Sequence, residues 1–344
     1  MPDLPARPDL DQLRHQAKDL LHAAQRGDPD STARIGTVSR RLILSSAQLA
    51  LAREYGFASW AKLKLEVERR DILNSRNLSR LTRLLAEHPE LATRPMEHWA
   101  DRQHGEPLGY ITMMQFNHDR LGLPRELPGT GAIARALIDA GAPVNGYPGD
   151  KETPLITAAS SGDADVARVL IEAGADIEAI SAPDSGGAPS STALGHAAVF
   201  GMTEVIDVLV AARARIDSLE MAAAAGDVSA WPLGRFTIQS RIRALVFAAD
   251  HQRLNVIDQL VEAGTPVNEA DAEWGRLPLH TAAGNGRPAS VRRLLARGAD
   301  PNLRDPKHNT TPLEESQGEN SPGHREVEAI LRPLTRGDTP EDRA

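Results

Sequence analysis

The sequence predicts an all-α protein, in which a solenoid of stacked helix pairs follows a helical N-terminal segment. A Leu followed in most cases by paired Ala recurs along the chain, and the equivalent residues are Leu155, Leu194, Leu245, Leu279 and Leu313. The last two intervals between them are both 34 residues. Aromatic residues form only 3% of the chain, so its apolar content is mainly Ala, Leu, Val and Ile, which suits thin, closely packed helices. Such a unit cannot bury its own apolar face, so copies must stack on one another.

One unit, GRLPLHTAAGNGRPASVRRLLARGADPNLRD, explains how each part forms. Pro278 fits the first turn of a helix, where a backbone N–H has no partner within the helix. Ala282 and Ala283 are small enough for neighbouring helices to approach closely. Gly286 and Gly298 permit the left-handed turns that end the two helices. The predicted inward stripe of the second helix is Val291, Leu294 and Leu295.

The segments LPLHTAAGNG, TPLITAASSGD, ARGADPN and EAGADIEA resemble ankyrin repeats, which share a T-P-L-H-x-A-A motif and a G-A-D-x-N exit. The resemblance is specific over residues 150–335 and weaker over residues 71–149. It implies helix pairs that are each followed by a β-turn finger, with fingers and first helices forming a concave binding face. It also implies that His280 ties adjacent fingers together by hydrogen bonds, and we expect His196 to pack in a similar way.

The regular spacing of the repeats is interrupted at three places along the chain. Residues 181–190, SAPDSGGAPS, lengthen one finger with small residues and are a candidate partner contact. Residues 218–228 predict an extra first helix, and the segment after it contains Pro232 and Gly234 and should be irregular. Residues 106–116 and 131–145 predict a helix pair that is separated by a long inserted loop.

Residues 1–70 do not fit the repeat and predict a helical N-terminal cap. Apolar residues at helical spacing predict a first helix, and a later helix should end near Tyr55 and Gly56, before another that Ser59 caps. The segment AREYGFASWAKLK resembles a helical leader found in front of bacterial ankyrin-type proteins. We expect this cap to cover the first repeat, REVEAILRPL to close the far end of the stack, and the polar residues 336–344 to be disordered.

Composition limits the classes of partner. Residues 1–70 hold 12 Lys and Arg against 9 Asp and Glu, whereas the remainder holds 27 against 38. This acidic remainder argues against nucleic acid as a partner. No apolar run is long enough to span a membrane, and the N-terminus lacks the apolar core of a secretory signal. The absence of Cys fits a reducing, cytoplasmic setting.

Motifs of catalysis are absent: the sequence has no Gly-rich phosphate loop, no G-x-S-x-G and no H-E-x-x-H. The densest polar cluster is EHWADRQHGE, in which His98 and Asp101 would be neighbours on a helix, with His104 close by. Such a pair could begin a metal or acid–base site, and a charged turn at a solvated edge is the alternative. We therefore predict no metal, no cofactor and no enzymatic activity.

The finger tips are the predicted contacts for a partner protein. By register, Trp274 lies at a tip where no core exists to bury it, beside Arg276, and this pairing is typical of a binding hot spot. The alternative is that Trp274 covers a neighbouring finger. The polar residues of the other tips complete the predicted surface: Asp150, Lys151, Glu152, Lys307 and His308.

A small-molecule or enzymatic pocket is the alternative function. It would be built from the distorted segments 97–116 and 218–247, where aromatic and polar residues gather near irregular backbone. Its predicted lining is His98, Trp99, Asp101, His104, Tyr110 and Trp231.

Overall fold

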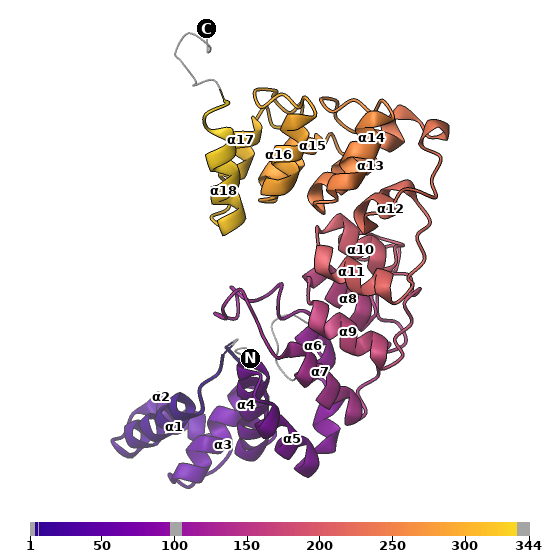
Figure 1. The fold of residues 1–344 in the computed structure, drawn as a ribbon. Helices are drawn as coiled ribbons and strands as arrows, with labels where there is room; N and C mark the ends of the chain where they lie inside the picture. The colour runs from indigo at the N-terminus through magenta and orange to yellow at the C-terminus, as the bar shows by residue number, and fades with distance from the viewer. Residues whose placement is uncertain (1–3, 6, 97–104, 336–344) are drawn as a thin grey trace, which may run out of the picture. The chain divides into compact units, whose positions relative to one another are not determined.

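The computed structural model describes residues 4, 5, 7–96 and 105–335 of the chain. Across these ranges the ordered elements are helices, and no strand is present (Figure 1). The chain divides into two compact units, Met1–Asp176 and Ile177–Ala344. This boundary lies inside the array predicted for residues 150–335.

The first unit begins with α1 (Leu10–Gln25), α2 (Pro29–Gly36), α3 (Leu44–Glu54) and α4 (Trp60–Ser75). Side-chain caps start α1 and α4: Asp9 accepts a hydrogen bond from Gln12 N at 2.8 Å, and Ser59 from Lys62 N at 3.3 Å. The predicted cap at Ser59 is thus confirmed. The inward faces of α1, α3 and α4 form an apolar core that includes Leu13, Ala17, Leu51, Phe57, Leu63 and Val67.

Helix α4 also buries a charged network. Glu66, Arg69 and Arg70 are only 5%, 1% and 0% exposed. The Glu66 carboxylate accepts hydrogen bonds from Arg69 Nη2 at 2.5 Å and from Arg70 Nε at 3.1 Å. Arg69 Nη1 also donates to the carbonyls of Leu91, at 3.2 Å, and Arg94, at 2.8 Å. Burial lowers the pKa of Arg69, and the Glu66 carboxylate opposes this shift. The network ties the chain beyond residue 90 to α4.

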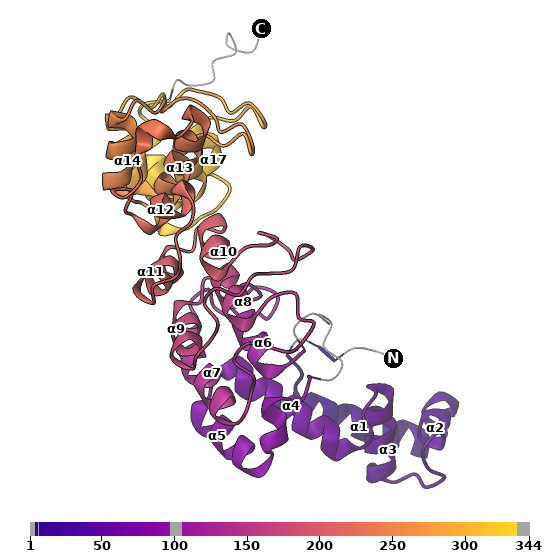
Figure 2. The same ribbon diagram turned by 90° about the vertical axis from the view of Figure 1, so that its right-hand side faces the viewer.

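The rest of the first unit consists of stacked helix pairs. Its elements are α5 (Leu78–Glu87), the 3-10 turn η1 (Pro89–Ala92), α6 (Pro107–Thr112), α7 (Thr130–Asp139), α8 (Pro154–Ser161) and α9 (Ala164–Glu172). The predicted pair within 106–145 is confirmed as α6 and α7, and residues 113–129 between them form turns. Helix α6 packs against α8 and α7 against α9, as Figure 2 shows.

The second unit continues the pattern. It contains α10 (Ala193–Val199), α11 (Thr203–Ala211), α12 (Leu219–Ala225), the 3-10 turn η2 (Leu233–Arg235), α13 (Ile238–Asp250), α14 (Leu254–Glu262), α15 (Pro278–Gly284), α16 (Pro288–Ala296), α17 (Pro312–Ser316) and α18 (Pro322–Leu331). The first helices α12, α13, α15 and α17 pack in sequence, and α14, α16 and α18 form a second row. The predicted extra helix is α12, and the irregular segment after it is confirmed.

The local rules expected for one repeat are confirmed with one exception. Pro278 occupies the first turn of α15, and Gly286 has a positive φ of 62°. Ala282 and Ala283 are fully buried. In the second helix Val291 and Leu294 are fully buried, whereas Leu295 is only partly buried, so the inward stripe is narrower than predicted.

Helix α18 packs very closely on the preceding repeat. Gly323, in its first turn, lies against the backbone of the α15–α16 turn, where a Cβ atom would be 2.3 Å from the carbonyl oxygen of Gly286. His324 Nε2 is 2.9 Å from the carbonyl oxygen of Gly284 and bonds to it. A residue without a side chain is therefore needed where the last helix meets the stack.

Candidate functional site

Two fingers of the second unit are built on the same plan, 34 residues apart. In the first, Asp271 N donates to Arg276 O at 2.9 Å, and in the second Asp305 N donates to Thr310 O at 2.9 Å. The Asp271 carboxylate accepts the backbone N–H groups of Glu273, at 3.1 Å, and of Trp274 and Arg276, both at 2.8 Å. One buried carboxylate thus fixes the backbone of the finger.

Asp305 performs the same task in the next finger. It accepts the N–H groups of Lys307 at 3.1 Å, His308 at 2.9 Å and Thr310 at 3.2 Å. Burial alone would raise the pKa of Asp305, but hydrogen bonds from the N–H groups of Thr310, His308 and Lys307 outweigh it and lower the pKa to about 2. The sequence interpretation missed both residues, although an Asp that recurs at a 34-residue interval is a usable signal.

Residues 181–190 form a longer finger with the same closure. Ser181 N donates to Ser191 O at 2.9 Å, and Ser181 Oγ donates to Ala188 O at 3.1 Å. The ring of Phe200 rests on the backbone of Gly187, where a Cβ atom would lie 2.3 Å from the ring. Phe200 remains 41% exposed, so this finger presents an apolar surface beside α10.

Buried histidines tie fingers and helices together. His280 Nε2 bonds to the carbonyl oxygen of Thr310 in the next finger at 3.0 Å, as the resemblance implied. His196 Nε2 lies 3.1 Å from Ser181 Oγ in its own finger. His251 bonds to the Ala198 carbonyl oxygen at 2.9 Å through Nε2. Burial lowers the pKa of all three rings. His280 and His251 thus connect different repeats, whereas His196 secures its own finger.

We expect the free energy of unfolding of the full chain to fall as the pH drops from about 7.5 to about 5.5. The folded-state pKa of each of these rings lies below the unfolded value of 6.5. The unfolded chain therefore binds more protons below this value, and stability present at neutral pH is lost on acidification. Each ring contributes up to ~1.4 kcal/mol per pH unit. Urea unfolding curves across this range measure the effect.

Replacing His251 by Gln should reduce this pH dependence. The variant lacks one buried ring whose pKa is lower in the folded chain than in the unfolded chain, so it binds fewer additional protons on unfolding. The exposed His15 provides the matched control substitution, His15→Gln. Identical pH dependence in His251→Gln and the unsubstituted chain would contradict the role assigned to burial.

The fingers of residues 271–276 and 305–310 border a groove of about 480 Å³, here called the finger groove. Phe200, His280 and Thr281 line it on the helix side, and Trp274, Arg276, Asp305, Lys307 and His308 line it on the finger side. A second hollow, of about 540 Å³, lies at the tips between Glu273, Trp274, Gly275, Arg276, Pro306 and Lys307 and is called the finger-tip hollow. The structure thus brings together four residues of the predicted surface: Trp274, Arg276, Lys307 and His308.

The exposure of Trp274 differs from the one expected from the sequence. It is partly buried, because its ring packs at 5.9 Å from the ring of Phe247 in α13. The Arg276 guanidinium lies 5.2 Å from the centre of the Trp274 ring. The expectation that no core reaches the tip is therefore wrong. Trp274 covers a neighbouring first helix and lines the finger groove as well.

Comparison with known families identifies the repeats. Family models described as ankyrin repeats match residues 129–220 and 260–315. The chain is therefore an ankyrin-repeat protein. Ankyrin repeats are generally protein-interaction scaffolds without catalytic activity of their own.

Two curated relatives match short segments of the chain. One segment of 88 residues, 26% of this chain, is 40% identical to E3 ubiquitin-protein ligase Ufd4 of Drosophila melanogaster. A segment of 69 residues, 20% of this chain, is 40% identical to the 2-5A-dependent ribonuclease of Homo sapiens. These matches span only 3% and 9% of the length of those proteins.

Among solved structures, the human ASB11 ankyrin repeat domain aligns with 80% of this chain and 99% of its own length. The identity is 20% and the TM-score is 0.37. None of the helices described for this ankyrin-repeat protein is long and apolar enough to cross a membrane.

The remaining predicted finger residues belong to the first unit of this ankyrin-repeat protein. Asp150 and Lys151 are exposed, and Asp150 Oδ2 accepts a hydrogen bond from Tyr147 N at 2.6 Å. Glu152 is partly buried, which raises its pKa, while a hydrogen bond from Thr157 opposes the shift. Their contact with a partner stays a prediction.

Of the residues predicted to line the alternative pocket, the structure describes Tyr110 and Trp231, one in each unit. His98, Trp99, Asp101 and His104 fall outside the described residues. Tyr110 is 3% exposed in the first unit, where its hydroxyl donates to Asn74 Oδ1 and burial raises its pKa well above the ordinary value. Trp231 belongs to the second unit, with its ring 5.9 Å from that of Phe236. A shared pocket of these residues stays a prediction.

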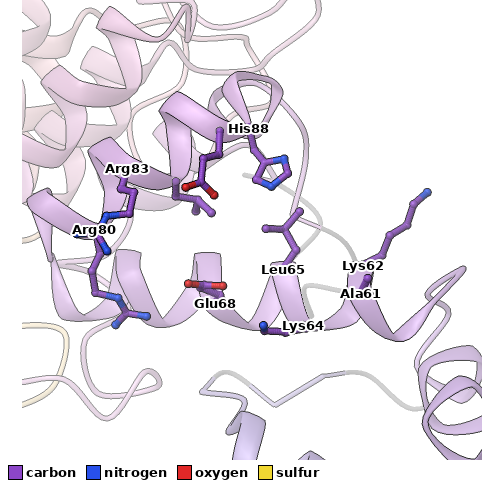
Figure 3. A pocket seen from close by; sticks show the side chains of 10 residues that line it. Ala61, Lys62, Lys64, Leu65, Glu68, Arg80, Arg83 and His88 are labelled. Carbon is purple, nitrogen blue, oxygen red and sulfur yellow. The ribbon is translucent and has the colours of Figure 1, made fainter. Parts of the chain in front are cut away.

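A third hollow, of about 460 Å³, lies between α4 and α5 of the first unit and was not expected from the sequence. Figure 3 shows Leu65 and Glu68 of α4 directed toward the space between the helices, with Arg83 of α5 beyond them. Its lining is Ala61, Lys62, Lys64, Leu65, Glu68, Arg80, Arg83, Leu84, Glu87 and His88. Charges of both signs line this hollow and no Phe, Trp or Tyr does, so the finger groove is the stronger candidate for recognition.

Asp305, His308 and Glu315 are a group of the described residues that could hold a metal ion, with ligand atoms within 4.8 Å of one another. The oxygens of this group already have protein partners. Asp305 accepts the finger N–H groups, and Glu315 Oε1 accepts a hydrogen bond from Thr310 Oγ1 at 2.5 Å. We therefore assign these side chains to the construction of the finger.

Proposed function

We propose that this protein is a non-enzymatic scaffold whose finger groove binds an extended segment of a partner protein. The observation that carries the proposal is the convergence of two adjacent fingers on one groove with an aromatic wall, formed by Phe200 and Trp274. The general role of ankyrin repeats supports it. The absence of Cys supports a cytoplasmic location.

The physical character of the groove suits protein recognition. Trp and Arg are the residue types that most often contribute strongly to binding, and here Arg276 lies over the ring of Trp274. The fingers are also rigid before binding, since Asp271 and Asp305 already hold their backbones. Little conformational entropy is then lost when a partner docks, which favours affinity.

Replacing Trp274 and Arg276 by Ala together should weaken capture of the partner by at least about tenfold, because the groove loses its aromatic wall and the cation beside it. Affinity capture from the source organism with mass spectrometry identifies a partner. Its dissociation constant is then measured with both forms of the full chain.

The matched control is Leu78→Ala with Arg83→Ala, which removes an exposed apolar residue and an exposed cation from α5. This control should bind like the unsubstituted chain. Equal affinity of the Trp274→Ala, Arg276→Ala variant would remove the finger groove from the proposal, provided that its unfolding curve shows a folded protein.

A further inference from the structure

The finger-tip hollow contains two cations without an anionic partner. Among the described residues, neither the Arg276 guanidinium nor the Lys307 ammonium group forms an ion pair. They come from adjacent fingers and line the same hollow. Most other arginines around them are paired: Arg243 with Glu273 and Glu220, and Arg287 with Asp250.

The acid of this hollow is already engaged. Glu273 lines it beside the two cations, and its carboxylate forms an ion pair with Arg243 Nη1. The uncompensated side-chain charge at the tips is therefore positive. A carboxylate of a binding partner would therefore meet two cationic donors, Arg276 and Lys307, and the one acidic residue that lines the hollow is already paired.

The acids deeper in the finger groove are engaged as well. Asp250 Oδ1 accepts a hydrogen bond from Asn285 Nδ2 at 2.8 Å and faces Arg287 Nε at 3.5 Å. The carboxylates of Asp305 and Glu315 accept hydrogen bonds within their finger. The deeper groove instead offers apolar surface from the exposed ring of Phe200 and the partly buried ring of Trp274.

Arg276 is oriented to receive a carboxylate. Its guanidinium lies over the Trp274 ring, 5.2 Å from the ring centre. Stacking of this kind restricts the guanidinium and leaves its N–H groups available at the edges, where a carboxylate binds in bidentate fashion. Lys307, on the opposite finger, adds a second charge that can reach the same ligand.

We propose that the partner segment is acidic, with a carboxylate of Asp or Glu bound between Arg276 and Lys307 in the finger-tip hollow. An apolar side chain of the same segment occupies the finger groove between Phe200 and Trp274. This inference rests on the proposed function, because it names the chemistry of the segment that the finger groove binds.

Selection from a library of random peptides of about 12 residues displayed on phage, with the full chain as target, tests the inference. Enriched peptides should carry Asp or Glu near an aliphatic or aromatic residue. For synthetic copies, the double variant Arg276→Glu, Lys307→Glu should weaken binding about 30-fold, as expected when opposite charges become like charges. Changing the peptide's acid to Lys should restore part of this loss in the variant.

The matched control is Lys62→Glu with Lys64→Glu in α4, which alters the net charge by the same amount at exposed positions of the first unit. It should leave peptide affinity unchanged. Equal loss in this control would assign the effect to net charge and overturn the inference.

Two results separate the inference from the proposed function. Peptides that lose affinity on Phe200→Ala or Trp274→Ala, but are not acidic or bind the charge-reversed variant equally well, overturn the inference and leave the groove as a binding site. If no enriched peptide depends on Phe200 or Trp274, the proposed function fails and the inference fails with it.

Discussion

Replacing Glu66 by Gln is expected to lower the free energy of unfolding of the first unit by about 3–5 kcal/mol. Glu66 is the carboxylate that accepts hydrogen bonds from both Arg69 and Arg70, and all three side chains are at most 5% exposed. A Gln amide keeps one acceptor but removes the negative charge. The Arg69 guanidinium, which is 1% exposed, then loses the charge of its carboxylate partner, and the expected cost is that of breaking a buried ion pair.

Urea unfolding of the full chain, together with hydrogen exchange of residues 60–95, measures this effect. Glu68→Gln is the control, because Glu68 lies on the same helix, is only partly buried and forms no ion pair among the described residues. We expect the control to change stability by less than about 0.5 kcal/mol. A loss below about 1 kcal/mol in Glu66→Gln would show that hydrogen bonds to backbone carbonyls satisfy Arg69 without Glu66.

Replacing Gly323 by Ala should destabilise the C-terminal end of the second unit by about 3 kcal/mol. The added Cβ would lie 2.3 Å from the carbonyl oxygen of Gly286, which is backbone and cannot rotate away. Helix propensity alone would favour Ala by about 1 kcal/mol. The sign of the measured change therefore decides between intrinsic propensity and packing.

Because α18 packs against α15, α16 and α17, the loss should be local to this end of the stack. Amide hydrogens of α18 should exchange faster in Gly323→Ala, while those of α10 and α11 keep their protection. Gly284→Ala is the control, since a Cβ there would meet only the Glu315 side chain, at 3.6 and 3.8 Å. Unchanged protection of α18 would show that this helix can move away from the turn at little cost.

Much of the fold could be predicted because it follows from local rules. Pro278, the paired Ala282 and Ala283, and Gly286 each act on their own turn of backbone, so their pattern indicates a helix pair without reference to the rest of the chain. The cap of α4 at Ser59 was predictable for the same reason. The ankyrin resemblance added the stacking of these pairs and the role of His280.

Features that depend on distant residues could not be predicted. Glu66, Arg69 and Arg70 look like a solvated helical surface in the sequence, yet all three are buried, and Arg69 bonds to the distant carbonyls of Leu91 and Pro95. Trp274 was expected to be exposed, but Phe247, in the preceding repeat, supplies apolar surface under it.

The finger groove was also only partly predictable. Register placed Trp274, Arg276, Lys307 and His308 at finger tips, yet Phe200 was not among the predicted contacts. Its ring rests on the glycine at position 187, which lies in the lengthened finger, so its place depends on a segment outside the regular repeat. Which tips share a hollow is decided by the stacking distance between repeats, and the sequence carries no direct measure of that distance.

The two fingers owe their shape to Asp271 and Asp305, whose carboxylates hold the backbone from inside the turn. Glu273 and Trp274 also contact α13, through Arg243 and Phe247, so the first finger is fastened to its neighbouring helix as well. Residues 306–308 are exposed, and the Asp305 carboxylate holds the backbone beneath them. The side chains of this second tip can therefore be changed, and with them what the protein recognises, while the two aspartates keep the fingers in shape.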